Sequence, residues 1–172
     1  TYTTVKSTYT LSSGMVTIYI KDSTAQTITL SATSAGPKSG TSGIITINPA
    51  GVNSYVVTSH SPQTAGTGWS EVVTGKDASN NTVTNDSSTV ITMTNTGAAS
   101  FYTDGTYTTV KSTYTLSSGV ATIYVMDSTA QTITLTATST GGKSGTSGVI
   151  TVNPGAIASY TINAHTPQVA GT

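Results

Sequence analysis

The sequence predicts an all-β protein made of tandem, two-sheet β-sandwich modules of the immunoglobulin-like class. Apolar and polar residues alternate along most of the chain, which is the pattern of half-buried strands. Turn residues, including 17 Gly and 5 Pro, interrupt this alternation at short intervals. The chain also repeats itself, because residues 1–67 align without a gap onto residues 106–172, at an offset of 105.

The repeat divides the sequence into modules. Of the 67 aligned pairs, 48 are identical, and the segment TYTTVKSTYTLSSG occurs twice without change. We expect residues 51–155 to form one complete module. Residues 1–50 would then be the C-terminal part of one module, and residues 156–172 the first strand of the next. The repeat therefore predicts a longer array, in which partial modules are completed either within the same polypeptide or by strand donation from a neighbour.

The strands of the complete module follow from the alternation and from the turn residues between them. Seven segments are predicted as strands: residues 52–60, 69–76, 88–95, 112–116, Val120–Met126, 132–138 and 149–153. Residues 82–84 are expected to add a short edge strand after a turn at 77–81. Residues 112–116 and Val120–Met126 are expected to form a hairpin, and residues 140–148 a glycine-rich loop. About seven strands in roughly 100 residues are typical of an immunoglobulin-like sandwich.

Comparison of the two copies indicates which face of each strand is buried. Alternate residues of Val120–Met126 stay apolar in both copies, whereas Met126 is replaced by Lys21, which only a solvent-facing position tolerates cheaply. The predicted core consists of the residues on the apolar parity: Tyr55, Val57, Trp69, Val73, Ile91, Met93, Ala121, Ile123, Val125, Ile133, Leu135, Ile150 and Val152. Glu71 shares the parity of Trp69 and Val73, so it is predicted to point inward unless a bulge resets the strand.

The composition excludes several classes of partner. Net charge is zero, and the six lysines are scattered over the sequence rather than clustered, so neither a nucleic acid nor an anionic membrane surface is expected to bind. No apolar run approaches the ~20 residues of a membrane-spanning helix. There is no Cys, and a module of about 100 residues can bury enough apolar surface to fold without disulfides. The 40 Thr and 24 Ser indicate a polar, uncharged surface that favours self-association.

Four segments together resemble a bacterial immunoglobulin-like repeat: SYVVTSHSPQTAG, KDASNNTVTN, LSSGVATIYVMDSTAQTITLTATS and GVITVNP. Such repeats form the tandem domains of invasin-type adhesins and of other large surface proteins. The family's opening signature is matched by Tyr55, Pro62, Ala65-Gly66 and Lys76-Asp77, and its middle hairpin by Gly119-Val120-Ala121-Thr122. Asn80-Asn81 stands where the family often has Gly-Asn. The resemblance implies a stalk, a spacer, an adhesive tip or a surface-layer repeat on the outside of a cell.

No catalytic, cofactor-binding or metal-binding residue is predicted, and we do not expect an enzyme. His60 and His165 occupy the same position in the two copies, without a recognisable nucleophile and orienting group. Asp77, Asn80 and Asn81 could offer oxygen ligands to Ca²⁺, but an Asp/Asn turn that bonds its own backbone explains them more simply. Glu71 needs a hydrogen-bond partner if it is buried, and a Lys–Asn amide crosslink promoted by this acid is a weaker alternative.

The expected function is therefore that of a structural, extracellular repeat, whose partners are neighbouring repeats in a fibre or a surface lattice. The alternative is an adhesin domain that binds a glycan or a host protein. The loop at residues 34–43 is nearly repeated at residues 139–148, whereas the loops of a binding module usually differ from those of its neighbours. The repeated loop therefore favours the spacer.

Overall fold

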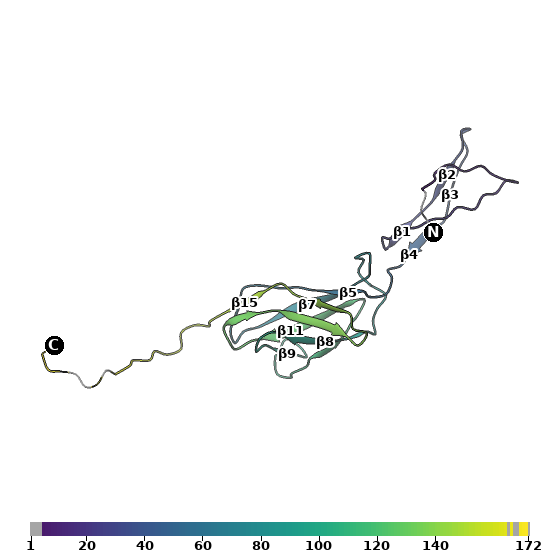
Figure 1. The fold of residues 1–172 in the computed structure, drawn as a ribbon. Helices are drawn as coiled ribbons and strands as arrows, with labels where there is room; N and C mark the ends of the chain where they lie inside the picture. Colours follow the sequence, from purple (N-terminus) through teal and green to yellow (C-terminus); the bar gives the residue numbers. More distant parts are fainter. Residues whose placement is uncertain (1–4, 165, 167–168, 172) are drawn as a thin grey trace.

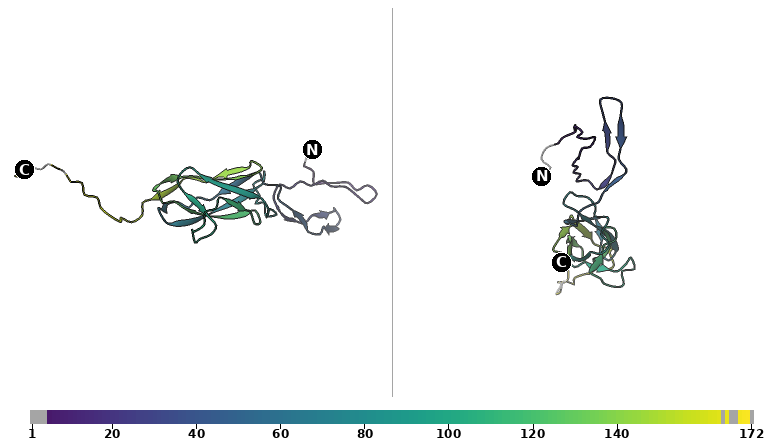
Figure 2. Two further views of the ribbon diagram at one scale, coloured as in Figure 1. Left: turned by 90° about the horizontal axis from the view of Figure 1, so that it is seen from below. Right: turned by 90° about the vertical axis from the view of Figure 1, so that its right-hand side faces the viewer.

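The computed structural model describes residues 5–164, 166 and 169–171, and it shows a β-sandwich between two less compact parts (Figure 1). The N-terminal part and the C-terminal segment leave the sandwich at opposite ends, as a second view confirms (Figure 2). The described residues form strands and turns and contain no helix. The predicted all-β class is therefore confirmed.

The first sheet of the sandwich has the strand order β5-β7-β11-β9. Its strands are β5 (Ser54–Val57), β7 (Gly68–Lys76), β9 (Ser100–Tyr102) and β11 (Val120–Met126). The two central strands, β7 and β11, run antiparallel over seven residue pairs, from Gly68↔Met126 to Thr74↔Val120. Alternate residues of both strands are buried, because successive side chains of a strand point to opposite faces of the sheet.

The second sheet has the order β10-β8-β13-β14 and covers the apolar face of the first. Its strands are β8 (Val90–Asn95), β10 (Thr113–Thr115), β13 (Leu135–Ser139) and β14 (Ser144–Thr146). A smaller sheet follows at one end, with β12 (Gln131–Ile133) antiparallel to β15 (Ile150–Asn153) and β15 parallel to β6 (Gln63–Thr64).

The core lies between the two larger sheets, and every residue of the predicted core is buried there. Ile91, Ile123 and Leu135 are fully enclosed. Each such side chain stabilises the fold by about 1.5–3 kcal/mol relative to an exposed one. Residues outside the predicted core set complete the interior: Val83, Ala99, Phe101, Tyr102, Tyr114, Leu116 and Ala137.

The expected single strand over residues 132–138 was wrong, because the chain changes sheets at Thr134. Residues before it pair with β15, and residues after it pair with β8 and β14. Two hydroxyls replace ladder partners at the crossing, since Thr134 N–H donates to Thr96 Oγ1 (3.0 Å) and Leu135 N–H to Ser147 Oγ (2.9 Å). The threonines of this segment therefore do not form one flat array.

The expected hairpin of residues 112–116 and Val120–Met126 was also wrong. Strand β10 pairs with β8, whereas β11 belongs to the opposite sheet, so the turn between them connects the two layers. Gly119 sits in this turn with a φ of 77°, and its N–H donates to the Asp86 carbonyl at 2.6 Å. The turn is thus held by a third segment, which the local sequence does not reveal.

Other boundaries differ from the expectation in smaller ways. Residues 140–148 contain the short strand β14 instead of forming only a loop, and residues 82–84 contribute an isolated bridge at Thr82 rather than an edge strand. Strands β6 and β9 were not predicted, because two or three residues are too few to show alternation.

The N-terminal part contains two short antiparallel ladders. One pairs β1 (Gln26–Ile28) with β4 (Ile45–Ile47), and the other pairs β2 (Ser31–Thr33) with β3 (Ser39–Thr41). The β1–β4 register, which includes Gln26↔Ile47, repeats that of β12 and β15 at the offset of 105. The chain continues past β15 as an extended segment whose described residues are exposed, including Tyr160.

Candidate functional site

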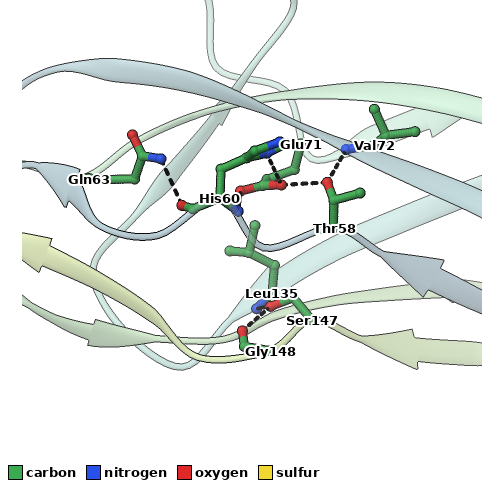
Figure 3. A network of polar contacts seen from close by, with 8 residues as sticks. All are labelled: Thr58, His60, Gln63, Glu71, Val72, Leu135, Ser147 and Gly148. Carbon is green, nitrogen blue, oxygen red and sulfur yellow. Dashed lines mark hydrogen bonds and ion pairs between the residues drawn. The ribbon is translucent and has the colours of Figure 1, made fainter.

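Among the described residues, Glu71 is the one buried acidic residue in the middle of a strand, and it belongs to the polar network drawn in Figure 3. Its position on β7 points the carboxylate inward, as the parity predicted, and its exposed fraction is 0%. One carboxylate oxygen, Oε1, accepts the His60 backbone N–H at 2.7 Å. The other, Oε2, accepts the Thr58 hydroxyl and lies 2.9 Å from His60 Nδ1.

These contacts hold the chain where β5 leaves the sheet. Thr58 N–H still donates to the Val72 carbonyl at 2.9 Å, but Val72 N–H donates to the Thr58 hydroxyl at 2.7 Å instead of to a carbonyl. Further along, the His60 N–H donates to the Glu71 carboxylate instead of to a carbonyl of the neighbouring strand. A buried carboxylate needs such donors, because an unpaired charge in the interior is costly. The network therefore satisfies the predicted need of Glu71 for a partner.

The geometry does not resemble a nucleophilic triad. In a triad the imidazole lies between the nucleophile and the acid, whereas here the acid lies between the Thr58 hydroxyl and the imidazole of His60. The imidazole is 65% exposed and forms no hydrogen bond with the hydroxyl in the described structure. No lysine contacts Glu71 in the described structure, so the arrangement also lacks the amine of a Lys–Asn crosslink. His165, the counterpart of His60, lies outside the described residues.

The second polar site is the turn at residues 77–81. Asp77 Oδ1 accepts the N–H groups of Ser79 and Asn81, both at 2.9 Å, and Asp77 Oδ2 accepts Asn81 Nδ2–H at 2.9 Å. The hydrogen bonds, led by that of the Asn81 side chain, lower the pKa of Asp77 from 3.8 to about 2. Asn80 adopts a φ of 66°, which Asn tolerates better than most residues.

This turn also bonds to the N-terminal part of the chain. Asn81 Oδ1 accepts the Ala25 N–H at 3.0 Å, and Asn81 Nδ2 donates to the Ser23 carbonyl at 2.8 Å. Asp77 Oδ2 accepts the Ala50 N–H at 3.0 Å. Since the side-chain oxygens face N–H donors, they are not arranged as ligands for a cation. Among the described residues, no group of three His, Cys, Asp or Glu side chains gathers as a metal site.

A surface hollow with a volume of about 500 Å³ lies between residues 51–55, 83–89 and 139–143. Tyr55, Asp86 and Lys143 border it, and the buried Tyr55 hydroxyl has no hydrogen-bond partner in the described structure. The hollow is open to solvent, and part of its lining comes from the repeated loop at residues 139–148. On the outer face of the first sheet, Tyr124 is half-buried beside Tyr107, at 6.2 Å between ring centroids.

Comparison with known proteins yields similarity of structure only. No family model and no curated protein sequence matches this chain. A glycosyl hydrolase family 2 member from Bacteroides cellulosilyticus is similar, with a TM-score of 0.50 and 14% identity over 73% of this chain. This chain spans 17% of the length of that hydrolase. At such identity the likeness shows the fold alone, and the activity of the larger enzyme does not follow for this chain.

Two further solved structures are also similar. Domains 4–9 of the surface layer protein SbsC give a TM-score of 0.45 and 18% identity, over 73% of this chain and 18% of that one. The D00-D0 domain of intimin gives 0.46 and 14%, over 73% of this chain and 63% of that one. In the described residues, no helix has the length and apolar character needed to cross a membrane.

Proposed function

We propose that this chain is a stretch of tandem structural modules from a large extracellular surface protein of a bacterium or archaeon, and that it provides reach and rigidity. One observation carries the proposal. The sequence of residues 1–67 recurs at residues 106–172, and side chains of the turn at residues 77–81 hydrogen-bond to the backbone of Ser23, Ala25 and Ala50 across a short connection. A short connection with fixed contacts restricts bending between modules.

The exposed apolar residues of the N-terminal part support the modular division into residues 1–50, 51–155 and 156–172. Ile18 and Leu11 are 43% and 62% exposed, whereas their counterparts Ile123 and Leu116 are 0% and 1% exposed. In the complete sandwich, residues 51–105 complete both sheets around these counterparts, with β5, β7 and β9 in the sheet of β11 and β8 in the facing sheet. We therefore propose that a segment equivalent to residues 51–105 covers the N-terminal part in the assembled protein, because an open apolar face is unfavourable in water.

The C-terminal segment fits the same division. Tyr160 and Ile162 are 84% and 92% exposed, whereas their counterparts Tyr55 and Val57 are 5% and 6% exposed within β5. We propose that residues 156–172 pair in the same way with strands of a following module. Whether the covering strands come from the same polypeptide or from a neighbouring chain decides between a covalent array and a strand-exchanged fibre.

The composition of the surface favours contact between modules of the same type. Charged residues are only 7% of the chain, and hydroxyl side chains dominate, so charge repulsion between modules is weak. We propose that neighbouring repeats are the main partners, in a fibre or a surface lattice on the outside of the cell.

The test is electron microscopy of the native surface material, with an antibody against residues 51–155 as the label. We expect the label to recur along a filament, a lattice or a stalk. A single label on an isolated globular particle would contradict the proposal. In parallel, specific binding of the folded chain to a glycan array would favour a ligand-binding adhesin instead.

A further inference from the structure

The contact between Asn81 and the N-terminal part uses a surface that occurs a second time in the chain. At the offset of 105, Ser23 and Ala25 correspond to Ser128 and Ala130, within the segment DSTAQTITL that is identical in both copies. Ala50, which bonds to Asp77, corresponds to Gly155. The two surfaces therefore offer the same backbone groups.

Both surfaces also have the same local structure. Asp22 accepts the Thr24 N–H and the Gln26 side-chain amide, each at 2.8 Å. In the second copy, Asp127 accepts the N–H of Thr129 at 2.9 Å and the side-chain amide of Gln131 at 2.7 Å. The strands that follow are paired in the same register in both copies. The second bend is therefore already formed without any module bound to it.

The two surfaces differ because only the first is in contact with a turn equivalent to residues 77–81. Ala25 is half-buried under Asn81, whereas Ala130 is exposed. In the part of the chain that the structure describes, neither the Ala130 N–H nor the Ser128 carbonyl has a hydrogen-bond partner. One donor and one acceptor thus remain free at the end of the sandwich opposite the occupied junction.

The occupant is indicated by the sequence that follows. Residues 156–172 repeat residues 51–67, the segment that leads into β7 and the turn at 77–81 in the complete module. We infer that residues 128–130, with Gly155, form the docking site for the turn of a second copy of this module, and that the Asn81 amide fixes the angle between consecutive modules. This inference rests on the tandem arrangement proposed above.

An Asn side chain suits this role because its planar amide has an acceptor and a donor at fixed positions. Asn81 Oδ1 accepts the Ala25 N–H, and Asn81 Nδ2 donates to the Ser23 carbonyl. Asn81 Nδ2 also donates to Asp77 Oδ2, which holds the side chain in this orientation. Two bonds from one rigid group define an orientation that a single bond would leave free to rotate. Asp lacks the donor, and Ala lacks both groups.

Amide hydrogen exchange in the full chain provides the first test. Ala25 and Ala130 have the same neighbours in sequence, so their intrinsic exchange rates are equal and a difference reports their surroundings. We expect Ala25 to exchange at least about tenfold more slowly than Ala130, and Asn81→Ala to remove the difference. Asn85→Ala is the matched control, because the Asn85 side chain is exposed and forms no hydrogen bond in the described structure.

Trp69 fluorescence checks that each variant is folded, since this only Trp is 7% exposed in the core. If Asn81→Ala perturbs the turn itself, Asn81→Asp provides a second variant, which keeps an acceptor for Ala25 and loses the donor to Ser23. Equal exchange of Ala25 and Ala130 in the unmodified chain would overturn the inference. Protection of Ala25 that survives both Asn81 substitutions would overturn it as well.

The second test asks whether the free surface is filled. The full chain is extended with a copy of residues 68–155, so that residues 156–172 are followed by the rest of a module. We expect the Ala130 amide hydrogen to exchange at least about tenfold more slowly in the extended chain. The Asn81→Ala change in the added copy should abolish this protection. An Ala130 amide that stays unprotected beside a folded added module would refute the docking site. These amide rates do not depend on the microscopy of native material, so the docking site and the proposed function can fail separately.

Discussion

Replacement of one isoleucine in each copy separates the effect of sequence from that of burial. Ile123 and Ile18 lie in corresponding positions, but their side chains are 0% and 43% exposed. Ile123→Ala removes buried methylene and methyl groups and leaves a cavity, which costs about 2–5 kcal/mol. Ile18→Ala changes a side chain outside the closed core, so we expect the sandwich to lose no more than about 0.5 kcal/mol.

Urea unfolding followed by Trp69 fluorescence measures this difference, because the chain's only Trp lies in the complete sandwich. A loss of about 3 kcal/mol at a slope of about 1.5 kcal/mol per molar urea lowers the midpoint by about 2 M. The Ile18→Ala midpoint should stay close to that of the unmodified chain. Equal shifts in the two variants would refute the reasoning, because they would show that the N-terminal part is enclosed in the same cooperative unit.

Three further predictions concern single contacts of the sandwich. Gly145→Ala should destabilise the sandwich by about 1–3 kcal/mol or more in the same urea assay, because the new Cβ would lie 1.8 Å from the Tyr55 carbonyl oxygen. At the matched position, the Cβ of Gly40→Ala would meet no atom within 4 Å, so this change should have little effect. Equal urea midpoints for the two variants would contradict the prediction. Glu71→Gln replaces one of two acceptor oxygens by a donor, which then faces either the Thr58 hydroxyl or the His60 N–H, so it should cost about 1–3 kcal/mol; an unchanged midpoint would show that the network does not need both acceptor oxygens. The pKa of Asp77 is lowered from 3.8 to about 2, so its contribution to stability is present above pH 3.8 and is lost as the pH falls through about 2. Between pH 5 and pH 2, the melting temperature of the unmodified chain should therefore fall more steeply than that of Asp77→Asn. Parallel plots of melting temperature against pH would contradict the assignment.

Parity was sufficient to predict the core and the direction of Glu71, because side chains of a strand alternate between faces regardless of which strands pair. The partners of Glu71 could not be predicted in the same way. Thr58 and His60 lie 13 and 11 residues away in sequence, and they reach the carboxylate only because β5 leaves the ladder beside it. The pairing of Asn81 with Ala25 spans 56 residues and has no local signal at all.

The sequence by itself determines the short-range structure of each copy. Tyr9 and Tyr114 both donate to the carbonyl three residues earlier, at 2.9 and 3.1 Å, although one lies in the partial module and the other in the core of the sandwich. Ser42 and Ser147 both accept the N–H twelve residues before them at 2.9 Å. These contacts form in either setting, because donor and acceptor belong to one turn or one hairpin.

Only the tertiary structure decides which sheet each strand joins and which apolar residues are buried. The same Thr-Ile-Tyr segment has its isoleucine exposed in the first copy as Ile18 and enclosed in the second as Ile123. The second copy is enclosed because residues 51–105 supply β5, β7 and β9 in the sheet of β11 and β8 in the facing sheet, strands whose equivalents the first copy lacks within this chain. Burial is a property of the assembled layers, so an identical local sequence has a closed core in one place and an open face in the other.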